Sequence, residues 1–519
     1  MNSLLRVEHV TISYNGKPVV QDVSFELKQG EILGIVGESG SGKSTIVKAI
    51  MGLLGEEGLV TRGDIWYKGE NITDMSEKKL RKLLGTEIGM VFQDCKAALC
   101  PVRTIGAQIH EAVSEHEKIS KKEVRERAGE IMKKIGLDDS DRVLDSYPFE
   151  LSGGMNQRVG ICTAMIMHPN LLLADEPTSA LDVTVQKQVV EELLIMRKTY
   201  NTAMILVTHN IGVVRMMADR ILVLRNGQVR DYGATEEVLD HPKDPYTKKL
   251  MSSVLYLKRK KIRRCAEMTD VILKADHLRK VFISGKKSMT AVDDVSFELK
   301  RGECLGIVGE SGSGKTTIAK MLTHLEPVTD GQIFLKGKDI TNVRGKILRK
   351  TYQDIQMVFQ MPMESFDPRR TLGDGIGESL RNMGISRAET RKRVENLFER
   401  CGLDAEYAGR YPHQVSGGQC QRAAIARALA VSPDILICDE ATSALDVTVQ
   451  KQILELLTEL KQKENLSFIL ICHDLALVQA FCDKVLVLYH GKTVEYGTPD
   501  DIIDHPKMDY TKKLIDSVL

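Results

Sequence analysis

The sequence lacks any long uninterrupted apolar segment. Nowhere in its 519 residues is there a run of about 18 apolar residues, the length that a bilayer-spanning helix needs. The N-terminus, which begins Met1-Asn2-Ser3, also lacks the apolar core of a secretory signal. We therefore expect a chain that neither crosses a membrane nor carries an export signal.

Neither sign of charge is in excess. The chain has 72 lysines and arginines against 71 aspartates and glutamates, a formal net charge of +1. A nucleic-acid-binding protein usually carries a strongly basic surface, and the global charge offers no sign of one. We therefore expect no nucleic-acid partner.

The cysteines follow no metal-binding or disulfide pattern. Ten are scattered along the chain, and the closest pair, Cys95 and Cys100, does not have a standard metal-ligand spacing. Cys438 and Cys472 lie inside apolar runs. Buried thiols in a reducing compartment are therefore favoured over a disulfide framework.

The composition itself is that of a globular protein, with 42% hydrophobic and 28% charged residues. A chain of this length is too long for one core, and two to four domains is the reasonable expectation. Internal repeats narrow this to two homologous domains, because segments recur at offsets of 264 or 272 residues. The repeated segments are His241–Leu250 at 505–514, Thr178–Gln186 at 442–450, and Gly34–Lys43 at 306–315.

The repeats predict domains at 1–255 and 271–519, joined by a basic linker at 256–270. The linker contains Lys258-Arg-Lys-Lys-Ile-Arg-Arg264, which is either a solvated connection or a contact for anionic lipid headgroups. The second copy is eight residues shorter between Lys315 and Ser416. We expect this difference to lie around a helical subdomain.

Each copy predicts an α/β core. A β-rich stretch comes first, and strands then alternate with helices. Glu31–Val36 and Leu171–Ala174 have the continuous apolar character of buried parallel strands, and residues 120–135 have helical spacing.

Both copies contain the pattern G-x-x-x-x-G-K-[ST] between an apolar strand and a helix. The glycines allow backbone amides to surround phosphate groups, and the helix N-terminus adds positive potential. Lys43 and Lys315 are expected to reach the β- and γ-phosphates, and Ser44 and Thr316 to ligate Mg²⁺. The expected phosphate-binding residues are Gly37, Ser39, Gly40, Ser41, Gly42, Lys43, Ser44 and Thr45, and in the second copy Gly309, Ser311, Gly312, Ser313, Gly314, Lys315, Thr316 and Thr317.

Two carboxylates end an apolar strand in each copy, Asp175-Glu176 and Asp439-Glu440. An isolated Asp-Glu pair at this place is usually only a strand terminus. Downstream of a phosphate loop, the aspartates suit the surroundings of Mg²⁺ and the glutamates suit polarisation of an attacking water.

Leu151-Ser-Gly-Gly-Met-Asn-Gln-Arg158 and Val415-Ser-Gly-Gly-Gln-Cys-Gln-Arg422 resemble the signature of ATP-binding cassette (ABC) ATPases. The resemblance covers the whole chain, twice. It implies two tandem P-loop NTPase domains, each with a RecA-like α/β core, an N-terminal antiparallel β subdomain and a helical subdomain. It also implies an ATPase that uses ATP and Mg²⁺.

The same resemblance implies roles for further residues. Gln93 and Gln360 correspond to the Q-loop glutamine at γ-phosphate and Mg²⁺, and His209 and His473 to the switch histidine. Tyr14 and Phe282 stand where the family stacks an aromatic ring on adenine, although core packing is a rival explanation. Ser179–Asp182 and Ser443–Asp446 resemble D-loops.

In the family, each signature closes over the nucleotide of the opposite cassette, so the resemblance implies a head-to-tail intramolecular dimer. Both sites should hydrolyse ATP, with asymmetry at most, because Met155 and Val415 depart from the usual glutamine and leucine. Site one is expected to combine Lys43, Ser44, Asp175, Glu176 and His209 with Ser416, Gly417 and Gly418; site two is expected to combine Lys315, Thr316, Asp439, Glu440 and His473 with Ser152, Gly153 and Gly154.

His241–Leu250, Phe359–Pro368 and Glu440–Asp446 resemble the oligopeptide, dipeptide and nickel importers. That branch implies two transmembrane permease subunits, an extracytoplasmic solute-binding protein, and a peripheral position on the cytoplasmic face of the plasma (inner) membrane. Peptide, nickel or metal chelate, and another small solute all remain open as cargo. Cys95 and Cys100 replace residues typical of the branch, with neutral packing favoured over a thiol metal site.

Two other cassette classes are disfavoured. A twin-cassette protein acting on ribosomes should have a long charged helical linker, and only about ten to fifteen residues are available. A DNA-repair cassette should have zinc-binding cysteine pairs or long coiled-coil insertions, and the sequence has neither.

Overall fold

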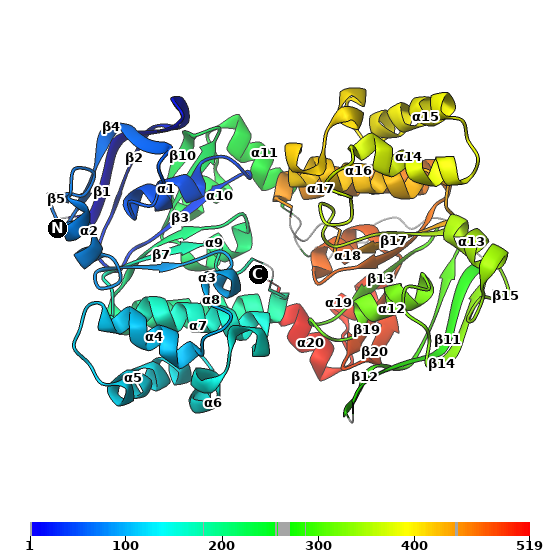
Figure 1. The fold of residues 1–519 in the computed structure, drawn as a ribbon, viewed down its shortest axis with the longest axis horizontal. Helices are drawn as coiled ribbons and strands as arrows, with labels where there is room; N and C mark the ends of the chain where they lie inside the picture. The colour runs from blue at the N-terminus through cyan, green and yellow to red at the C-terminus, as the bar shows by residue number, and fades with distance from the viewer. Residues whose placement is uncertain are drawn as a thin grey trace.

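The computed structural model describes residues 3–179, 181–254, 257, 270–285, 287–441 and 445–518. They form two halves built from nearly the same succession of elements (Figure 1); in these ranges the second half has no helix that corresponds to α3 (Cys95–Ala98), and a 3₁₀ helix replaces α6 (Ser140–Asp145). The predicted linker 256–270 lies outside the described residues except for Leu257 and Asp270, and so do residue 180 of the first D-loop and residues 443–444 of the second. The domain boundaries therefore stay predictions.

The first half runs from β1 to α11. Its strands are β1 (Leu5–Tyr14), β2 (Lys17–Leu27), β3 (Ile32–Gly37), β4 (Gly58–Tyr67), β5 (Glu70–Asn71), β6 (Ile88–Val91), β7 (Leu171–Asp175), β8 (Ala203–Val207), β9 (Arg220–Arg225) and β10 (Gln228–Ala234). Its helices are α1 (Lys43–Ile50), α2 (Glu77–Leu83), α3 (Cys95–Ala98), α4 (Ile105–Ser114), α5 (Lys121–Lys134), α6 (Ser140–Asp145), the 3₁₀ helix η1 (Pro148–Glu150), α7 (Gly153–Met165), α8 (Val183–Tyr200), α9 (Ile211–Met217), α10 (Thr235–Asp240) and α11 (Pro245–Ser253).

The second half repeats this order from β11 to α20. Its strands are β11 (Val271–Ser284), β12 (Lys287–Lys300), β13 (Cys304–Val308), β14 (Asp330–Leu335), β15 (Lys338–Asp339), β16 (Ile355–Val358), β17 (Ile435–Asp439), β18 (Ser467–Ile471), β19 (Lys484–Tyr489) and β20 (Lys492–Gly497). Its helices are α12 (Lys315–Leu322), α13 (Gly345–Asp354), α14 (Leu372–Asn382), α15 (Arg387–Arg400), η2 (Ala405–Gly409), η3 (Pro412–Gln414), α16 (Gly417–Leu429), α17 (Val447–Glu464), α18 (Leu475–Phe481), α19 (Pro499–Asp504) and α20 (Asp509–Asp516).

Each half contains a four-stranded antiparallel sheet and a six-stranded sheet. The orders in the first half are β2-β1-β4-β5 and β10-β9-β3-β8-β7-β6, and the second half matches them. In the six-stranded sheet only the edge strand β10, or β20, runs antiparallel to its neighbour. The predicted α/β core and antiparallel β subdomain are thus confirmed in both halves.

The six-stranded sheet is covered on both faces, which explains its continuous apolar strands. In β3, Leu33 and Ile35 face a core shared with α1 and the antiparallel sheet. The alternate residues Ile32 and Val36 face a second core, formed with helices including α4, α5, α7 and α8. The loop that follows β3 therefore starts from a strand that is fixed on both sides.

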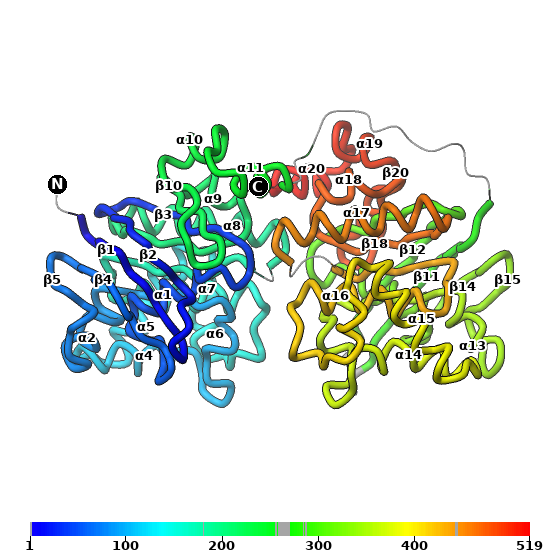
Figure 2. The backbone as a smooth tube through the Cα atoms, turned by 90° about the horizontal axis from the view of Figure 1, so that it is seen from above, coloured from blue at the N-terminus to red at the C-terminus, as the bar shows by residue number. Residues whose placement is uncertain are grey.

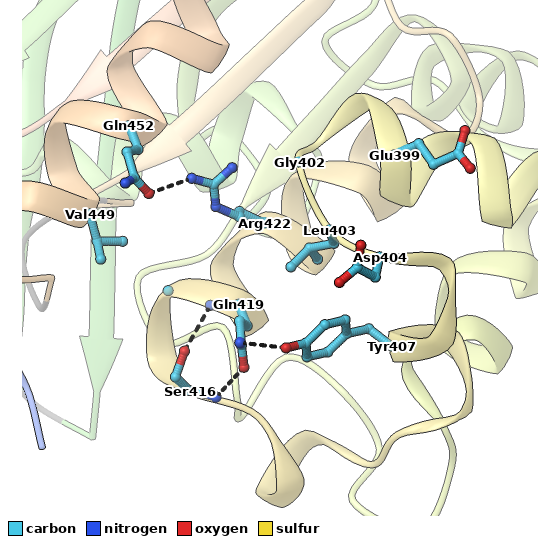
Figure 3. Close-up of a pocket in the computed structure, with 11 residues that line it drawn as sticks. Glu399, Gly402, Leu403, Asp404, Tyr407, Ser416, Gln419, Arg422, Val449 and Gln452 are labelled. Carbon is cyan, nitrogen blue, oxygen red and sulfur yellow. Dashed lines mark hydrogen bonds between the residues drawn. The ribbon is translucent and has the colours of Figure 1, made fainter.

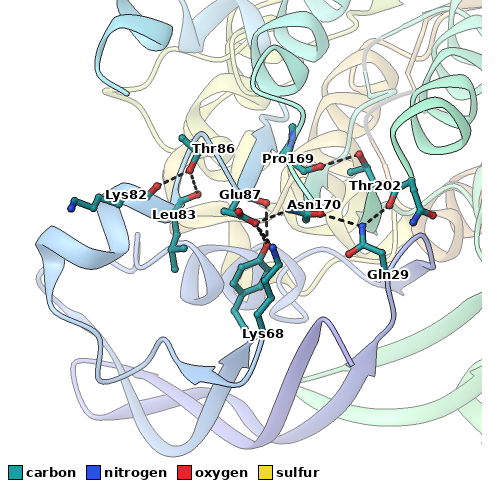
Figure 4. Close-up of polar contacts among 11 residues, drawn as sticks. Gln29, Lys68, Lys82, Leu83, Thr86, Glu87, Pro169, Asn170 and Thr202 are labelled. Carbon is teal, nitrogen blue, oxygen red and sulfur yellow. Dashed lines mark hydrogen bonds and ion pairs between the residues drawn. The ribbon is translucent and has the colours of Figure 1, made fainter. Parts of the chain in front are cut away.

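A polar cluster fastens the antiparallel sheet to the six-stranded one (Figure 4). The Glu87 carboxylate accepts hydrogen bonds from Lys68 Nζ (2.6 Å), Tyr67 Oη (3.0 Å) and Asn170 Nδ2 (2.7 Å). Burial alone raises the pKa of Glu87, but these donors outweigh it and bring the pKa below its usual value. The cluster joins the end of β4 to the starts of β6 and β7.

We had expected the eight-residue difference between the copies to lie around the helical subdomain, but most of it lies elsewhere. The segment from the phosphate-loop lysine to the Q-loop glutamine has a length of 50 in the first half and 45 in the second; the next segment, to the signature serine, has 59 and 56. β4 has 10 residues and its counterpart β14 has 6, and the longer β4 pairs with β1 as far as Tyr14. The expectation is therefore wrong for five of the eight residues, which lie before the Q-loop glutamine, and the longer β4 accounts for four of them.

An ion pair anchors the signature helix of the first half. On α7, Arg158 Nε donates to Glu192 Oε1 on α8 at 2.8 Å, and Arg158 also donates to Gln188. The two side chains are only 14% and 9% exposed. In the second half the repeat places Leu456 at the position of Glu192. Burial raises the pKa of Glu192, so its charge depends on Arg158.

We predict that Arg158→Met destabilises the first half by about 3 kcal/mol, because it leaves a buried carboxylate without a counter-ion. For a domain of this size, that corresponds to a loss of about 6–12 °C in Tm, which calorimetry can measure. In the folded variant, the pKa of Glu192 should lie above the unfolded value of about 4.3, so ionising Glu192 at higher pH lowers the free energy of unfolding. The loss should therefore be larger at pH 8 than at pH 5.

The control is the double variant Arg158→Met/Glu192→Leu, which copies the apolar residue of the second half. It should recover most of the lost stability. A double variant as unstable as Arg158→Met alone would show that the buried charge is not the cause.

Candidate functional site

The two phosphate loops lie at the ends of β3 and β13. Gly37 closes β3 with a φ of +155°, and a Cβ atom there would lie 2.2 Å from the backbone oxygen of Leu224. Gly309 has a φ of +151°, and its Cβ would lie 2.2 Å from Leu488 O. Only glycine fits where the chain leaves each strand. The predicted residues 38–42 and 310–314 form the loops, and Lys43–Thr45 and Lys315–Thr317 begin α1 and α12.

Each loop lysine folds back into its own loop. Lys43 Nζ donates to Gly37 O and Glu38 O, both at 2.9 Å, and Lys315 Nζ makes the equivalent two bonds at 2.8 Å. The lysines are 6% and 5% exposed, and burial lowers the pKa of both. A buried ammonium group whose hydrogen bonds, among the described residues, go to backbone carbonyls is a favourable partner for an anion.

The loops also contain polar atoms without partners. The buried hydroxyl oxygens of Ser41 and Ser313 have no hydrogen-bond partner among the described residues. Together with the buried lysine and the N-terminus of α1 or α12, they form a cradle that suits phosphate oxygens. The residues present therefore fit a nucleotide.

A hydroxyl and a carboxylate meet beside each loop. Ser44 Oγ donates to Asp175 Oδ1 at 3.0 Å, and Thr316 Oγ1 donates to Asp439 Oδ1 at 3.2 Å. Burial raises the pKa of Asp175, and it raises the pKa of Asp439 to about 6. A donor set made only of oxygen atoms next to a phosphate cradle fits Mg²⁺.

The predicted glutamate, glutamine and histidine also come together. Gln93 Nε2 donates to Glu176 Oε2 at 2.9 Å, and His209 Nδ1 lies 3.3 Å from Glu176 Oε1. In the second half, Gln360 Nε2 donates to Glu440 Oε2 at 2.6 Å. There His473 Nδ1 lies 3.9 Å from Glu440 Oε1.

Both glutamates have an unusual backbone conformation and a lowered pKa. The φ angles of Glu176 and Glu440 are +49° and +46°, in the left-handed region that non-glycine residues rarely adopt. Burial alone raises the pKa of Glu176, but His209 and Lys43 bring it below its usual value; contact with His473 lowers the pKa of Glu440. Both glutamates are thus carboxylates near neutral pH, able to accept a proton or a hydrogen bond.

The predicted adenine-stacking residues lie at the ends of the first strands. Tyr14 ends β1 opposite Gly58, and Phe282 lies near the end of β11 with its ring 4.8 Å from Lys280 Nζ. Both are half-buried. Their role with adenine stays a prediction.

The two signature segments cap their helices differently. Ser152 Oγ accepts from Met155 N, and Ser416 Oγ accepts from Gln419 N, both at 3.3 Å. Only Gln419 returns a bond, accepting from Ser416 N at 2.9 Å, and it also donates to Tyr407 Oη at 2.8 Å (Figure 3). This network borders a pocket of about 550 Å³.

The glycines of the signatures allow close helix packing. A Cβ on Gly154 would lie 2.8 Å from Val185 on α8, and one on Gly418 would lie 2.6 Å from Val449 on α17. Gly153 and Gly417, by contrast, face open space at the helix N-termini. The signature helices are thus seated on α8 and α17 with their first amides accessible.

The two halves touch through reciprocal contacts near the loops. Ser311 N, in the second phosphate loop, donates to Asp182 Oδ2 of the first half at 3.3 Å. α11 packs against α17, and α20 packs against α8. Figures 1 and 2 place α11 and α20 at the midline, and Figure 1 draws α1 with α16 in its upper part and α7 with α12 in its lower part.

Two tyrosines that contact the phosphate loops were not expected from the sequence. Glu38 N donates to Tyr246 Oη at 3.2 Å, and Glu310 N donates to Tyr510 Oη at 3.0 Å. Both tyrosines belong to the repeated His-Pro-x-x-x-Tyr-Thr segment, which we had interpreted only as a mark of the branch. Their recurrence in both copies was the available signal.

The two cysteines after the first Q-loop glutamine differ in burial. Cys95 is buried against Gly160 of α7, its Sγ donates to Phe92 O at 3.3 Å, and burial raises its pKa to about 12. Cys100 is exposed. Within the described part of the chain, no three His, Cys, Asp or Glu side chains cluster as metal ligands would. Neutral packing fits Cys95.

None of the helices in the described ranges has the length and apolar character needed to cross a membrane. This agrees with the hydropathy of the sequence.

Comparison with known proteins gives matches over both halves. A family model described as "ABC transporter" matches residues 20–179 and 292–443. A second model, "Oligopeptide/dipeptide transporter, C-terminal region", matches residues 231–275 and 494–519. The segments that contain Tyr246 and Tyr510 lie within the second model.

Relatives align along nearly the whole chain. The glutathione import ATP-binding protein GsiA of Salmonella choleraesuis (strain SC-B67) is 37% identical over 549 residues, covering 98% of this chain and 88% of that protein. GsiA of Escherichia coli (strain K12) is 36% identical over 561 residues, covering 99% and 89%.

Among solved structures, a dimeric bacterial ABC transporter cassette is 28% identical, with a TM-score of 0.42, covering 44% of this chain and 99% of that one. The family models and the relatives agree. The chain therefore belongs to the ABC transporter family, in its oligopeptide/dipeptide branch, and is an ATP-hydrolysing, twin-cassette ATP-binding subunit of an importer.

Proposed function

We propose that this ATPase drives uptake of a short peptide, in the size class of glutathione, by hydrolysing ATP at two composite sites. The observation that carries the proposal is the completeness of both sets of residues. Each half has a lysine bonded inside its phosphate loop, a hydroxyl–aspartate pair, and a glutamate that contacts a glutamine and a histidine. Two complete sets favour two hydrolysing sites over one active and one silent site.

The contacts across the midline support shared sites. Asp182 of the first half accepts from the second phosphate loop and favours the charged form of Lys315. Asp446 of the second half favours the charged form of Lys43 in the same way. Each loop thus faces the opposite half. We infer that Ser416–Gly418 complete site one and Ser152–Gly154 complete site two, where the accessible helix N-termini would bind γ-phosphate oxygens.

At site one, Lys43 and the loop amides bind the phosphates, and Ser44 and Asp175 hold Mg²⁺. Bound Mg²⁺ neutralises charge that develops on the phosphate oxygens. Glu176 accepts a hydrogen bond from water and aligns it for in-line attack on the γ-phosphorus. As the new P–O bond forms, the bond between the γ-phosphorus and the β–γ bridging oxygen breaks, and that oxygen leaves with ADP. The proton that water loses passes to Glu176 and then to the released phosphate.

Gln93 and His209 position Glu176 from its two sides, because each contacts a different carboxylate oxygen. Site two repeats these roles with Lys315, Thr316, Asp439, Glu440, Gln360 and His473. Site one differs in its signature, because Gln419 accepts a hydrogen bond from Ser416 N and donates another to Tyr407, and Met155 can provide neither for Ser152. We therefore infer that site one closes more readily than site two.

The relatives support the proposed cargo and partners. The two named above, which align over nearly the whole chain, are described as glutathione import proteins, which favours a small peptide over nickel or a metal chelate. A motor of this kind works with two transmembrane permease subunits and an extracytoplasmic solute-binding protein, on the cytoplasmic face of the plasma (inner) membrane. Phe92 and Met361, which flank the Q-loop glutamines and are exposed, suit a permease contact.

We predict that the full chain, purified under mild detergent from its source membrane, brings down two multispanning membrane proteins. With the solute-binding protein added, glutathione should stimulate ATP turnover of the assembled complex, and nickel alone should not. Recovery with ribosomes or DNA instead of membrane proteins would refute the transport role. Stimulation by nickel without any response to a peptide would refute the cargo.

A second prediction concerns the two hydrolysing glutamates. Glu176→Gln and Glu440→Gln, made separately, should each lower ATP turnover at the mutated site about tenfold or more and leave ATP binding intact, because the amide cannot activate water. Glu176→Gln should have the larger effect, since it disables the site with the better-fixed signature. ATP turnover and nucleotide affinity are measured on each variant.

The matched control is Glu191→Gln, an exposed glutamate on α8, which should leave turnover unchanged. If either site variant keeps full activity, that site does not hydrolyse ATP, and the inference of two competent sites is wrong.

A further inference from the structure

Each half ends in a short helix whose tyrosine reaches back to its own phosphate loop. Tyr246, in the first turn of α11, is buried, and its hydroxyl accepts from Glu38 N at 3.2 Å. Its ring lies 4.7 Å from the Arg225 guanidinium. Tyr510 of α20 accepts from Glu310 N at 3.0 Å and packs its ring 4.2 Å from that of Tyr489. The equivalent tyrosines thus make the same bond in both halves.

The peptide group that each tyrosine holds is the one that receives the loop lysine. In the Gly37–Glu38 peptide, Glu38 N–H donates to Tyr246, while Gly37 O accepts from Lys43 Nζ. The second half repeats this arrangement in the Gly309–Glu310 peptide. A backbone N–H needs an acceptor, and among the described residues a side chain from the end of the domain provides it. The tyrosine therefore fixes the orientation of a peptide whose carbonyl faces the phosphate-binding lysine.

The other end of each short helix is held by the opposite half. Lys451 Nζ, on α17, donates to Ser252 O at 3.2 Å, and Lys187 Nζ, on α8, donates to Asp516 O at 2.8 Å. The last carbonyls of a helix lack partners within the helix and carry partial negative charge. α11 has no basic residue in its own last turn, so the positive charge comes from the other half.

Lys187 and Lys451 lie in the first two turns of α8 and α17, a few residues after the N-cap aspartates that face the opposite phosphate loop. Lys187 follows Asp182, the N-cap of α8, whose Oδ2 accepts from Ser311 N in the second loop. The second loop is therefore joined to α8 twice, directly through Asp182 and indirectly through Tyr510, α20 and Lys187. Lys451 follows the N-cap Asp446 of α17 in the same order.

We propose that α11 and α20 are interdomain struts that hold each phosphate loop in register with the opposite half. Tyr246 and Tyr510 are positioning residues at one end of the struts, and Lys451 and Lys187 are positioning residues at the other end. The proposal rests on ATP binding at the phosphate loops, and neither the cargo nor the permease enters it.

A strut of this kind couples the two nucleotide sites. When ATP binds in the first loop, a shift of the Gly37–Glu38 peptide would move Tyr246 and with it α11. Because α11 packs against α17, the shift would reach Asp446, the N-cap of α17, whose charge acts on Lys43. Coupling between sites is reciprocal, so disturbing either end should weaken communication in both directions. Cooperativity in ATP binding is the expected readout.

The test begins with Tyr246→Phe and Tyr510→Phe in the full chain. Each keeps the packed ring and removes only the hydroxyl acceptor, a loss that corresponds to roughly 3- to 10-fold in an equilibrium constant. We expect the KM for ATP to rise by about that factor while kcat changes less than about twofold. In nucleotide-free protein, the amide of Glu38 or Glu310 should exchange with deuterium faster by a similar factor.

Tyr232→Phe and Tyr496→Phe are the matched controls. Their hydroxyls also lie within hydrogen-bond distance of backbone oxygens, those of Glu26 and Glu298, each at 3.4 Å, but on β2 and β12 rather than at a phosphate loop. They should change neither the KM nor the exchange of the loop amides. If Tyr246→Phe and Tyr510→Phe behave like these controls, the tyrosines do not position the loops.

The second test breaks the far end with Lys451→Met and Lys187→Met. Lys451→Met should speed exchange of the Glu38 amide in the first half, and the Hill coefficient for ATP should fall toward 1. Lys451→Arg and Lys187→Arg, which keep the positive charge, should restore both. A Met variant whose exchange changes only near its own helix would overturn the strut. If the chain fails to co-purify with a permease but shows these responses, the transport role is contradicted and the strut is not.

Discussion

Everything at the active sites depends on a buried ammonium group held inside a tight backbone loop. Lys43 and Lys315 are nearly enclosed, and their only hydrogen bonds in the described structure go to carbonyls of their own loops. Carbonyl dipoles compensate a buried positive charge only in part, and this is why burial lowers both pKa values. The loop is thus shaped without nucleotide, and phosphate oxygens would satisfy the charge better.

Much of this could be predicted from local sequence. Three features are each specified by a few neighbouring residues, and the structure confirms them. They are the turn at Gly37 that only glycine can make, the apolar strands buried on both faces, and the carboxylate Asp175 at the end of β7. The helix predicted at 120–135 is likewise found at Lys121–Lys134, capped by Ser120 and Glu123. The contacts of Glu176 with Gln93 and His209 join residues 83 and 33 positions apart, and only the family resemblance indicated them.

The contacts between elements far apart in the chain could not be predicted from the sequence, and the reason is physical. Tyr246 reaches a loop 208 positions away, and Lys187 reaches a carbonyl 329 positions away. Such bonds leave no periodic pattern, because one side chain and one backbone group suffice. The length difference between the copies is visible in the sequence, but sequence length alone does not show that four of the eight residues extend β4 along β1.

The two halves have nearly the same chemistry but different supports. The lysine, hydroxyl–aspartate and glutamine–glutamate bonds agree within 0.3 Å between them. The signature helices differ: α7 is anchored by the Arg158–Glu192 ion pair and lacks the returning bond at Ser152, whereas α16 has Gln419 and Tyr407. If hydrolysis requires a signature to meet the opposite loop, a difference in rate between the sites arises mainly from how firmly each signature is held. Unequal turnover would then originate in the helical subdomains, although the phosphate loops perform the chemistry.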